Sequence, residues 1–491
     1  MSVKTKQKAE FGDFQTPDAL AQGVCDVVRC LGVIPESIVE PTCGKGSFLR
    51  ASAATFSKNV PIFGFEINPE YAEAAQAVEQ AKVHCEDFFK KDWLATLNSL
   101  REPILVIGNP PWVTNSTVGS LGGTNLPNKS NFQRFSGFDA ITGKSNFDIS
   151  EWMLVHLLEC LSGRKAVLAM LCKVAIARKV LGYVWNKNLQ IARSAIYSID
   201  ATRHFDASVD ACLLVCILEP VSASKECDIY LDLEASAHDS KFAFRNGRLV
   251  SNLQANESYG YLRGKSPLKW RSGVKHDCTR IMELHPKGRD DFENGLGEVV
   301  SLEPNYLYPM LKSSELMKPQ PTPSRYMLVT QRWVGEDTSR IEREAPWTWD
   351  YLQSHAKELD NRMSSIYRNR PRFSVFGIGP YSFAPWKVAI SGFYKRIDFR
   401  CVGPAGNTPV VLDDTCYFLP CQTEHDAQVL AELLNSEAAK VFFYSFIFWD
   451  AKRPITAQLL ESLDLGMLAE EAGVSLPVWS DVPQQIALFG S

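Results

Sequence analysis

The sequence lacks the features that mark exported, membrane-spanning or metal-binding proteins. Its start, MSVKTKQKAEFGDF, has lysines but no apolar segment behind them, so we expect no secretory signal. The longest apolar runs, such as residues 211–218, fall far short of the roughly 18 residues of a membrane helix. The 13 cysteines have no paired metal-ligand spacing, which predicts free, reduced and mostly buried thiols and no bound metal. These absences predict a cytoplasmic protein without a membrane partner.

A strong overall charge is also missing, since the 491 residues carry a formal net charge of only −4. The length predicts two or three domains. The charge is uneven locally, because residues 241–400 hold 26 Lys and Arg residues against 17 Asp and Glu residues. A polyanionic partner is therefore indicated for this region alone, where the alternative is a solvated basic face.

Up to about residue 220, short apolar segments alternate with amphipathic ones. Several apolar segments are continuous runs, as in strands buried on both faces of a parallel sheet. Segments between them, such as residues 69–80 and 149–161, have the composition or spacing of helices. The alternation predicts an open α/β sheet with helices on both faces. The expected strands are residues 37–40, 61–67, 82–85, 104–107, 166–171, 196–200 and 212–218.

After about residue 240 the chain becomes aromatic-rich and basic, without this alternation. Residues 424–443 have a helical pattern but no residues that indicate chemistry. Residues 113–145 are rich in Ser, Thr, Asn and Gly, and loops longer than about 12 to 15 residues are usually functional or disordered. A lid beside a site and plain disorder are both open for this segment.

Three consecutive strand ends carry residues suited to a nucleoside. The first strand ends at Glu40 and runs into PTCGKG (residues 41–46), whose glycines let a ligand approach the backbone. Glu66 closes the second strand, about where a dinucleotide-type fold places the carboxylate that binds ribose hydroxyls. Asp87 and Phe88 end the third, where an acid could accept an adenine amine and the ring could stack. Taken singly, each is more often an ordinary turn residue or a helix cap.

The fourth strand ends in NPPW, residues 109–112. Two prolines stiffen the backbone after Asn109, so its side-chain oxygen and the Pro110 carbonyl can point in one fixed direction. Two fixed acceptors suit the grip of an amino group, and the face of Trp112 could stabilise positive charge that develops on the nitrogen. The alternative is a turn with a core tryptophan.

These motifs resemble the S-adenosylmethionine-dependent amino DNA methyltransferases. Their order, with the glycine turn first, NPPW next and a basic region last, is similar to the gamma arrangement of the N6-adenine enzymes. FQTP (residues 14–17), GKSNFD (residues 143–148) and HFD (residues 204–206) also look like motifs of this family. The resemblance covers roughly residues 11–220.

The resemblance implies a fold, a domain division and a cofactor. The fold is a Rossmann-like class I methyltransferase with a mostly parallel seven-stranded sheet and one reversed edge strand, plus a C-terminal mixed α+β target-recognition domain. Residues 1–240 would form the catalytic domain and residues 241–491 the DNA target-recognition domain with a C-terminal helical segment. The enzyme would move a methyl group from S-adenosylmethionine to the N6 amine of an adenine turned out of duplex DNA, at a cost of a few kcal/mol.

The resemblance also assigns roles to residues. Asn109, Pro110 and Trp112 would be catalytic, and Phe147 and Phe205 would contact the substrate base. The implied cofactor-binding residues are Thr16, Pro17, Glu40, Thr42, Gly44, Gly46, Glu66, Ile67, Asp87, Phe88, Asn109 and Pro111. In the basic region, the residues expected to hold phosphates or read bases are Lys265, Lys269, Trp270, Arg271, Lys275, Arg332, Arg368, Arg370 and Arg372.

Several alternatives stay open. The same grip serves N4-cytosine methylation, glutamine methylation in proteins and base methylation in structured RNA. A different class is a catalytically silent DNA-binding subunit. Because the first motif begins near residue 11, we expect no fused nuclease. The chain is then the modification enzyme of a prokaryotic restriction-modification system, and any cognate restriction endonuclease is a separate protein.

Overall fold

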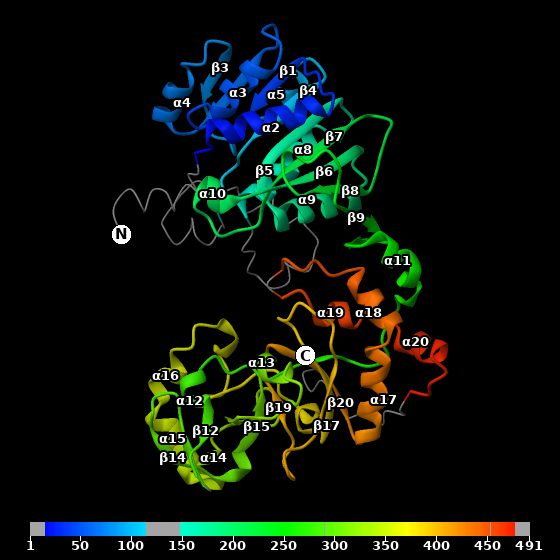
Figure 1. Ribbon diagram of the computed structural model, residues 1–491. Helices are drawn as coiled ribbons and strands as arrows, with labels where there is room; N and C mark the ends of the chain where they lie inside the picture. Colours follow the sequence, from blue (N-terminus) through cyan, green and yellow to red (C-terminus); the bar gives the residue numbers. More distant parts are fainter. Residues whose placement is uncertain (1–14, 114–147, 289, 452, 477–491) are drawn as a thin grey trace, which may run out of the picture. The chain divides into compact units, whose positions relative to one another are not determined.

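The computed structural model describes residues 15–113, 148–288, 290–451 and 453–476. Two units follow one another along the chain, residues 1–253 and residues 254–491. The first holds the α/β elements at the top of Figure 1 and the second holds short strands and helices. The first unit extends beyond the predicted boundary at residue 240.

The first unit is built on a ten-stranded sheet with the order β10-β9-β8-β6-β7-β5-β4-β1-β2-β3. Strands β1 to β5 are parallel wherever they pair with one another, and all residues of β4 are buried, as expected for a strand covered on both faces. The strands are β1 (Ser37–Glu40), β2 (Ile62–Glu66), β3 (Ala81–Cys85), β4 (Ile104–Gly108), β5 (Ala166–Lys173), β6 (Ile191–Ile199), β7 (Ala211–Leu218), β8 (Glu226–Tyr230), β9 (Ser240–Arg245) and β10 (Arg248–Val250).

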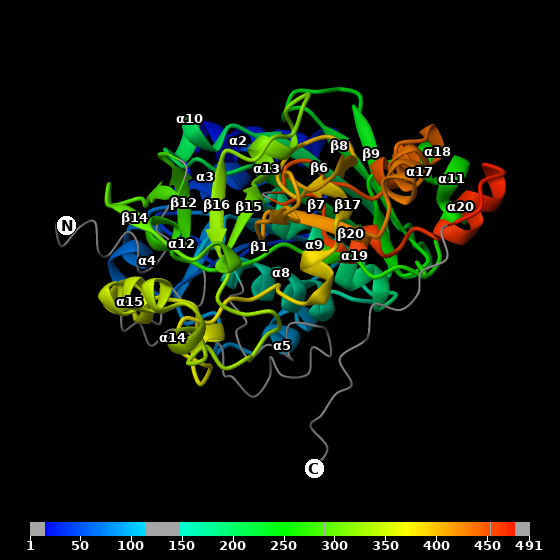
Figure 2. The same cartoon turned by 90° about the horizontal axis from the view of Figure 1, so that it is seen from below.

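Helices cover both faces of this sheet, as predicted. Figure 2 shows α2, α3 and α10 on one side of β1 and α5, α8 and α9 on the other. The helices are α2 (Asp18–Cys30), α3 (Ser47–Thr55), α4 (Pro69–Ala75), α5 (Trp93–Asn98), α8 (Ile149–Cys160), α9 (Val174–Asn186) and α10 (Ala201–Phe205). One core of buried side chains runs beneath α2 and α3 across β1, β4, β5 and β7 to Trp112 and Phe205.

The predicted sheet needs a correction. Two strands are reversed. β7 pairs antiparallel with both β5 and β6, and β9 pairs antiparallel with both β8 and β10, so both lie inside the sheet rather than at its edge. The sheet then continues through β8, β9 and β10. Residues 241–250 belong here because Asn246 and Gly247, both with positive φ, close a hairpin turn, and Phe242 packs its ring 5.8 Å from that of Trp185.

The second unit contains two sheets. The smaller has the order β11-β20-β17-β18 and the larger the order β14-β13-β12-β16-β15-β19. Every strand pair in them is antiparallel except β15 with β19. The strands are β11 (Arg271–Ser272), β12 (Glu283–Pro286), β13 (Asp291–Glu293), β14 (Val299–Ser301), β15 (Leu307–Leu311), β16 (Arg325–Leu328), β17 (Trp386–Ser391), β18 (Arg400–Val402), β19 (Val411–Leu412) and β20 (Cys416–Cys421).

The predicted helix over residues 424–443 is two helices, because Ser436 caps the second through a hydrogen bond from Ala439 N. All 13 cysteines are free thiols and nine are buried, which confirms the prediction of free, mostly buried thiols. The helices are α11 (Leu253–Tyr259), α12 (Thr279–Met282), α13 (Ser313–Leu316), α14 (Ile341–Glu344), α15 (Pro346–Ser354), α16 (Ala356–Asp360), α17 (Glu424–Leu434), α18 (Glu437–Tyr444), α19 (Ala457–Leu460) and α20 (Leu465–Glu471). Short 3-10 turns are η2 (Gly260–Leu262), η3 (Pro304–Tyr306), η4 (Ser365–Tyr367) and η5 (Pro380–Phe383).

Candidate active site

The turn after β1 forms the first part of the candidate site. Gly44 and Gly46 have φ angles of 51° and 83°, a backbone region that residues with a Cβ rarely adopt. A Cβ on Gly44 would lie 2.9 Å from the side-chain oxygen of Gln15. Gly46 is also the residue from which α3 begins. The glycines are therefore needed both for the conformation of this turn and for the close approach of the N-terminal segment.

Glu66, the last residue of β2, braces this turn. Its Oε2 accepts a hydrogen bond from Gly44 N at 2.8 Å and its Oε1 accepts one from Asn68 N at 2.8 Å. These two bonds fix the orientation of the carboxylate, and a carboxylate oxygen can accept more than one hydrogen bond. Ile67, which follows, is exposed.

Asp87 and Phe88, after β3, have different surroundings. Asp87 accepts a hydrogen bond from Phe89 N at 3.0 Å and lies 3.5 Å from the Lys90 ammonium. The ring of Phe88 is only 6% exposed and lies 4.9 Å from that of Trp93. Asp87 is therefore half-buried after its strand, whereas Phe88 packs in an aromatic cluster. Stacking of Phe88 on an adenine stays a prediction, and only the small exposed part of its ring could make that contact.

Asn109 follows β4 and meets two other predicted residues. Its Nδ2 donates to Thr16 Oγ1 at 3.2 Å, and its backbone carbonyl accepts from Thr42 Oγ1 at 3.5 Å. Residues far apart in the sequence thus meet at the end of the fourth strand, which joins the N-terminal FQTP motif and the glycine turn to NPPW. Pro17 stands immediately before α2, and its carbonyl accepts from the N–H groups of Leu20 and Ala21.

Trp112 is fixed against β5 and α10. Its indole N–H donates to Leu171 O at 3.4 Å, and its ring forms a T-shaped contact with the ring of Phe205, with 5.2 Å between centroids. Trp112 and Phe205 are 6% and 9% exposed. Pro110 is buried and Pro111 is half-buried. The tryptophan therefore serves as a core residue, and only a small part of its ring is left for a substrate.

Glu40, the last residue of β1, is a buried acid beside the end of β4. It is 2% exposed, and its Oε2 has no hydrogen-bond partner among the described residues. Burial, and secondarily the nearby Glu66 carboxylate, raise the pKa of Glu40 well above its ordinary value. A Cβ on Gly108 would lie 3.3 Å from Glu40 Cγ. The site therefore contains a buried carboxyl group whose surroundings favour the neutral form, and one of its oxygens accepts no hydrogen bond from the described residues.

Some predicted residues lie outside the described part of the chain. These are Phe147, the expected base contact, Phe14 of the FQTP motif, and residues 114–145 of the expected lid or disordered segment. Gln15 was included in the FQTP motif but was given no role there, and its Oε1 accepts from Lys45 N at 3.3 Å. Its position directly before Thr16 was the available signal.

The residues of the second unit that were predicted to bind DNA divide into two groups. Those of the first group are buried or already contact another side chain. Trp270 is 3% exposed and packs 5.7 Å from Phe399, so it is a core residue, which corrects the prediction that it faces DNA. Lys275 pairs with Asp277 at 3.1 Å and Asp414 at 3.7 Å. Arg372 pairs with Asp360 at 2.6 Å, and Arg271 lies 4.4 Å above the Tyr381 ring.

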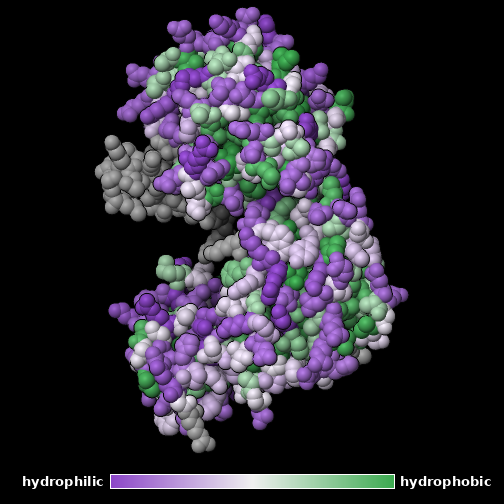
Figure 3. Space-filling view, in the orientation of Figure 1, coloured by the Kyte–Doolittle hydropathy of each residue, from purple (hydrophilic) through white to green (hydrophobic). Residues whose placement is uncertain are grey.

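The second group is exposed. Within the described residues, five predicted side chains are exposed and form no ion pair: Lys265, Lys269, Arg332, Arg368 and Arg370. The last three lie on two joined loops, since Thr330 Oγ1 donates to Phe373 O at 2.7 Å and Val375 N donates to Gln331 Oε1 at 3.0 Å. Trp333, which the sequence reasoning missed, is 38% exposed beside Arg332. Figure 3 shows hydrophilic residues over most of the visible surface of both units.

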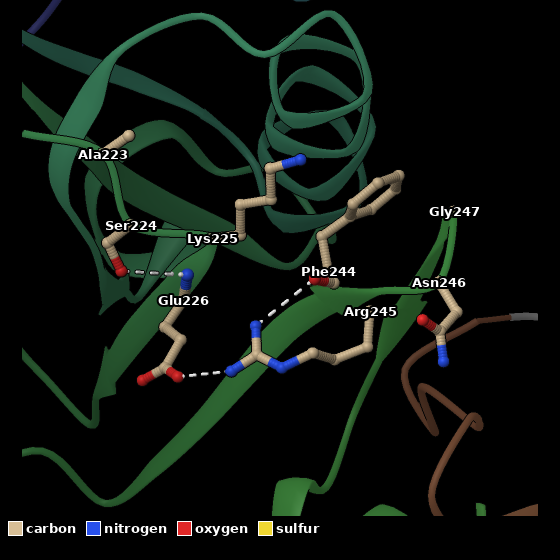
Figure 4. Close-up of a pocket in the computed structure, with 8 residues that line it drawn as sticks. All are labelled: Ala223, Ser224, Lys225, Glu226, Phe244, Arg245, Asn246 and Gly247. Atoms are coloured by element: carbon tan, nitrogen blue, oxygen red, sulfur yellow. Dashed lines mark hydrogen bonds and ion pairs between the residues drawn. The ribbon is translucent and has the colours of Figure 1, made fainter.

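A separate pocket lies at the other end of the main sheet (Figure 4). It is lined by the start of β8 and the β9–β10 turn. There Arg245 donates to Glu226 at 2.5 Å, and Lys225 Nζ lies 5.5 Å above the Phe244 ring. In the strand order, four strands (β6, β7, β5 and β4) lie between β8, which lines this pocket, and β1. Its size and lining therefore have no bearing on the candidate site at β1 to β4.

The described residues, 15–113, 148–288, 290–451 and 453–476, contain neither a candidate membrane span nor a candidate metal cluster. No helix in those ranges is both long and apolar enough to span a membrane. No cluster of three or more His, Cys, Asp or Glu side chains there could hold a metal ion.

The chain is similar to known DNA-modifying proteins. Residues 2–174 match the family model described as N-6 DNA Methylase. The type II methyltransferase M.NspV of a Nostoc species is 47% identical over 473 residues, which cover 95% of this chain and 98% of that protein. The type II methyltransferase M.CvrRI of a Paramecium bursaria Chlorella virus is 32% identical over 115 residues, 23% of this chain and 28% of that protein.

Two solved structures share the fold along most of the chain. The type IIL restriction-modification enzyme MmeI in complex with DNA superposes with a TM-score of 0.54 and 12% identity, over 94% of this chain and 68% of its own. The DrdV–DNA complex gives a TM-score of 0.53 and 10% identity, over 95% and 57%. With the family match and the M.NspV relationship, the chain belongs to the N-6 DNA methylase family of S-adenosylmethionine-dependent methyltransferases, and it is a DNA methyltransferase of the restriction-modification type.

Proposed function

We propose that this chain methylates the N6 amine of an adenine that is turned out of duplex DNA, as the modification enzyme of a restriction-modification system. The observation that carries the proposal is the contact of Asn109 with Thr16 and Thr42, because it joins the amine-binding motif to the glycine turn. The names of the type II methyltransferases M.NspV and M.CvrRI support the modification role.

The residues at the strand ends fit S-adenosylmethionine. The turn at Gly44 and Gly46 can receive a ligand close to the backbone, and Glu66 is held where it could accept ribose hydroxyls. Glu40 Oε2 offers a buried acceptor that has no hydrogen-bond partner in the described part of the chain, and a cationic ligand would favour the ionised form of this carboxyl group. When bound, S-adenosylmethionine supplies an activated methyl group on a sulfonium.

The protein's own contribution is to hold and orient the amine. Because Asn109 Nδ2 donates to Thr16, the amide oxygen is the part of this side chain that accepts from the amine. Together with the Pro110 carbonyl it would bind both amine hydrogens and favour a localised nitrogen lone pair. The exposed part of the Trp112 ring would stabilise the positive charge that develops on nitrogen. A T-shaped contact with the ring of Phe205 helps to hold the Trp112 ring in place.

The second unit is the proposed DNA-binding surface. Arg332, Arg368 and Arg370 suit phosphate contacts because none of them forms an ion pair within the described residues, although the Glu344 carboxylate is close enough to Arg332 to interact with it electrostatically. A Cβ on Gly335 would lie 3.9 Å from Arg370 Nη1, so the two loops present these charges near one another. Lys265 and Lys269 add exposed charge on a separate segment.

The test is transfer of labelled methyl from S-adenosylmethionine to plasmid DNA, followed by analysis of the nucleosides. We expect N6-methyladenine. Asn109→Ala should lower the transfer rate at least about 100-fold while calorimetric cofactor binding survives, since the lost acceptor acts on the amine. Asn59→Ala, at an exposed site before β2, is the matched control and should retain full activity.

Three outcomes would contradict the proposal. Label in N4-methylcytosine would favour the alternative amine. Full activity of Asn109→Ala would remove the proposed grip. Cofactor binding without any transfer to DNA by the unaltered protein would favour a catalytically silent DNA-binding subunit.

A further inference from the structure

Lys173, the last residue of β5, contacts the NPPW motif, although it belongs to none of the sequence motifs described above. Its Nζ donates to Asp148 Oδ2 at 2.6 Å and to the Trp112 carbonyl at 3.4 Å. Lys173 is 25% exposed and Asp148 only 6%. The ammonium therefore joins a largely buried carboxylate to the backbone of NPPW.

Asp148 uses its other oxygen to start α8. Oδ1 accepts from Ser150 N at 3.1 Å and from Ser150 Oγ at 2.6 Å. The neighbouring Ile149 N donates to Val113 O at 2.9 Å. The first turn of α8 is thus bonded both to Lys173 and to the residue that follows Trp112, so three parts of the chain are locked together at one point.

Trp112 is consequently held at both ends by β5. Its indole N–H donates to the Leu171 carbonyl, and its own backbone carbonyl accepts from the ammonium of Lys173, which lies two residues after Leu171 on the same strand. A tryptophan ring fixed at one end only could rotate about its side-chain bonds. Two anchors on one buried strand fix the ring relative to the backbone that carries Asn109.

We propose that Lys173 is a positioning residue for methyl transfer, whose ammonium, paired with Asp148, holds the Trp112 carbonyl and thereby the orientation of the amine-binding tip. The inference rests on the proposed function, in which Asn109 and Trp112 hold the base. It assigns Lys173 no contact with the substrate. A displacement near 1 Å at such a site can reduce a rate about 100-fold.

The first test compares Lys173→Met, Asp148→Asn and the double variant. Lys173→Met alone leaves a buried carboxylate without its cation and should lower the unfolding temperature. Asp148→Asn keeps an oxygen for the α8 cap. The double variant removes both charges, so its unfolding temperature should return toward that of the unaltered protein, whereas its rate should not return.

The rate to measure is single-turnover methyl transfer to plasmid DNA at saturating S-adenosylmethionine. We expect Lys173→Met and the double variant to lose about 10-fold to 100-fold, with cofactor affinity changed less than about twofold. Lys173→Arg, which can still donate to both oxygens, should recover most of the rate. Lys179→Met is the matched control, because it breaks an α8–α9 ion pair with Glu151 that does not contact NPPW.

Recovery of the rate in the double variant along with its stability would show that the pair only stabilises the fold and would overturn the inference. So would an unchanged rate in Lys173→Met. Failure of the proposed function is a distinguishable result. It would be seen as no methyl transfer to adenine by the unaltered protein, or as full activity of Asn109→Ala. An active parent, an inactive Asn109→Ala and a fully active Lys173→Met would reject this inference alone.

Discussion

The two units use different kinds of structure to gather their candidate functional residues. In the first unit, Gly44, Glu66 and Asn109 come from the ends of neighbouring parallel strands and are fixed by hydrogen bonds that involve the backbone. In the second, Arg332 and Arg370 are exposed side chains on loops, the first between β16 and α14 and the second between η4 and η5. A parallel sheet brings its strand ends to one edge whatever lies between them. On loops, each charge is available only if no acid lies beside it.

The second unit shows why local charge is a weak guide to a binding surface. Lys312 and Arg325 do not contribute to the exposed charge, because they pair with the buried Glu283 at 2.6 Å and 3.0 Å. Burial opposes the ionisation of Glu283, but hydrogen bonds from His276 and Lys312 outweigh it and lower the pKa of this carboxyl to about 2. Part of the positive excess of residues 241–400 therefore stabilises the interior.

The largest expected effect concerns Trp270, which separates the core of the second unit from its surface. Trp270→Ala should reduce the free energy of unfolding by about 3–5 kcal/mol, because it removes a large buried side chain. Chemical denaturation measures this loss. Lys269→Ala, at the exposed neighbour, should change the free energy by less than about 0.5 kcal/mol. A Trp270→Ala protein of unchanged stability but weakened DNA binding would mean that Trp270 contacts DNA and is not a core residue.

The next effect concerns the exposed arginines. Replacing Arg332, Arg368 and Arg370 by alanine should reduce the salt dependence of DNA binding by about 2.7 units of slope if each contacts one phosphate. Affinity at low salt should fall roughly 100-fold or more. Arg372→Ala should alter the slope less than Arg370→Ala, because Asp360 already pairs with Arg372. Titration of labelled duplex DNA at several salt concentrations gives both values, and equal slopes for these two variants would remove the distinction.

The same contrast explains what the sequence could predict. β1 and β4 were predicted within one residue because continuous apolar runs end at a proline or glycine, and the site residues follow those ends. Trp270 was misassigned because its burial depends on Phe399, which lies far along the chain. Lys173 was missed because Trp112 and Asp148, its partners, become neighbours only in the folded sheet. Local patterns predict strand ends, whereas pairing and burial need the tertiary structure.

The smallest effect concerns buried ionisable groups, which both units contain. In the first unit burial raises the pKa of Glu40, and in the second burial lowers the pKa of Lys387 to about 7. Lys387 is 1% exposed in β17, and its ammonium donates to Ala384 O at 2.6 Å. Both environments favour the neutral form, but only Glu40 lies beside residues predicted to bind a ligand. Lys387 should therefore affect stability without affecting the chemistry.

The sign of the Lys387 effect follows from proton binding. Between pH 7 and its ordinary value of 10.5 the unfolded chain binds more protons at this lysine than the folded chain, so stability rises with pH in that window and is lowest below it. From pH 7 to pH 8 this group should add about 1 kcal/mol. Denaturation of Lys387→Met at both values should lack that increment, whereas Lys395→Met, at an exposed site, should retain it. An identical increment in both variants would mean that Lys387 is charged in the fold. Methyl transfer should be unaltered in either variant, because neither residue belongs to the strand ends of the first unit that carry the proposed site.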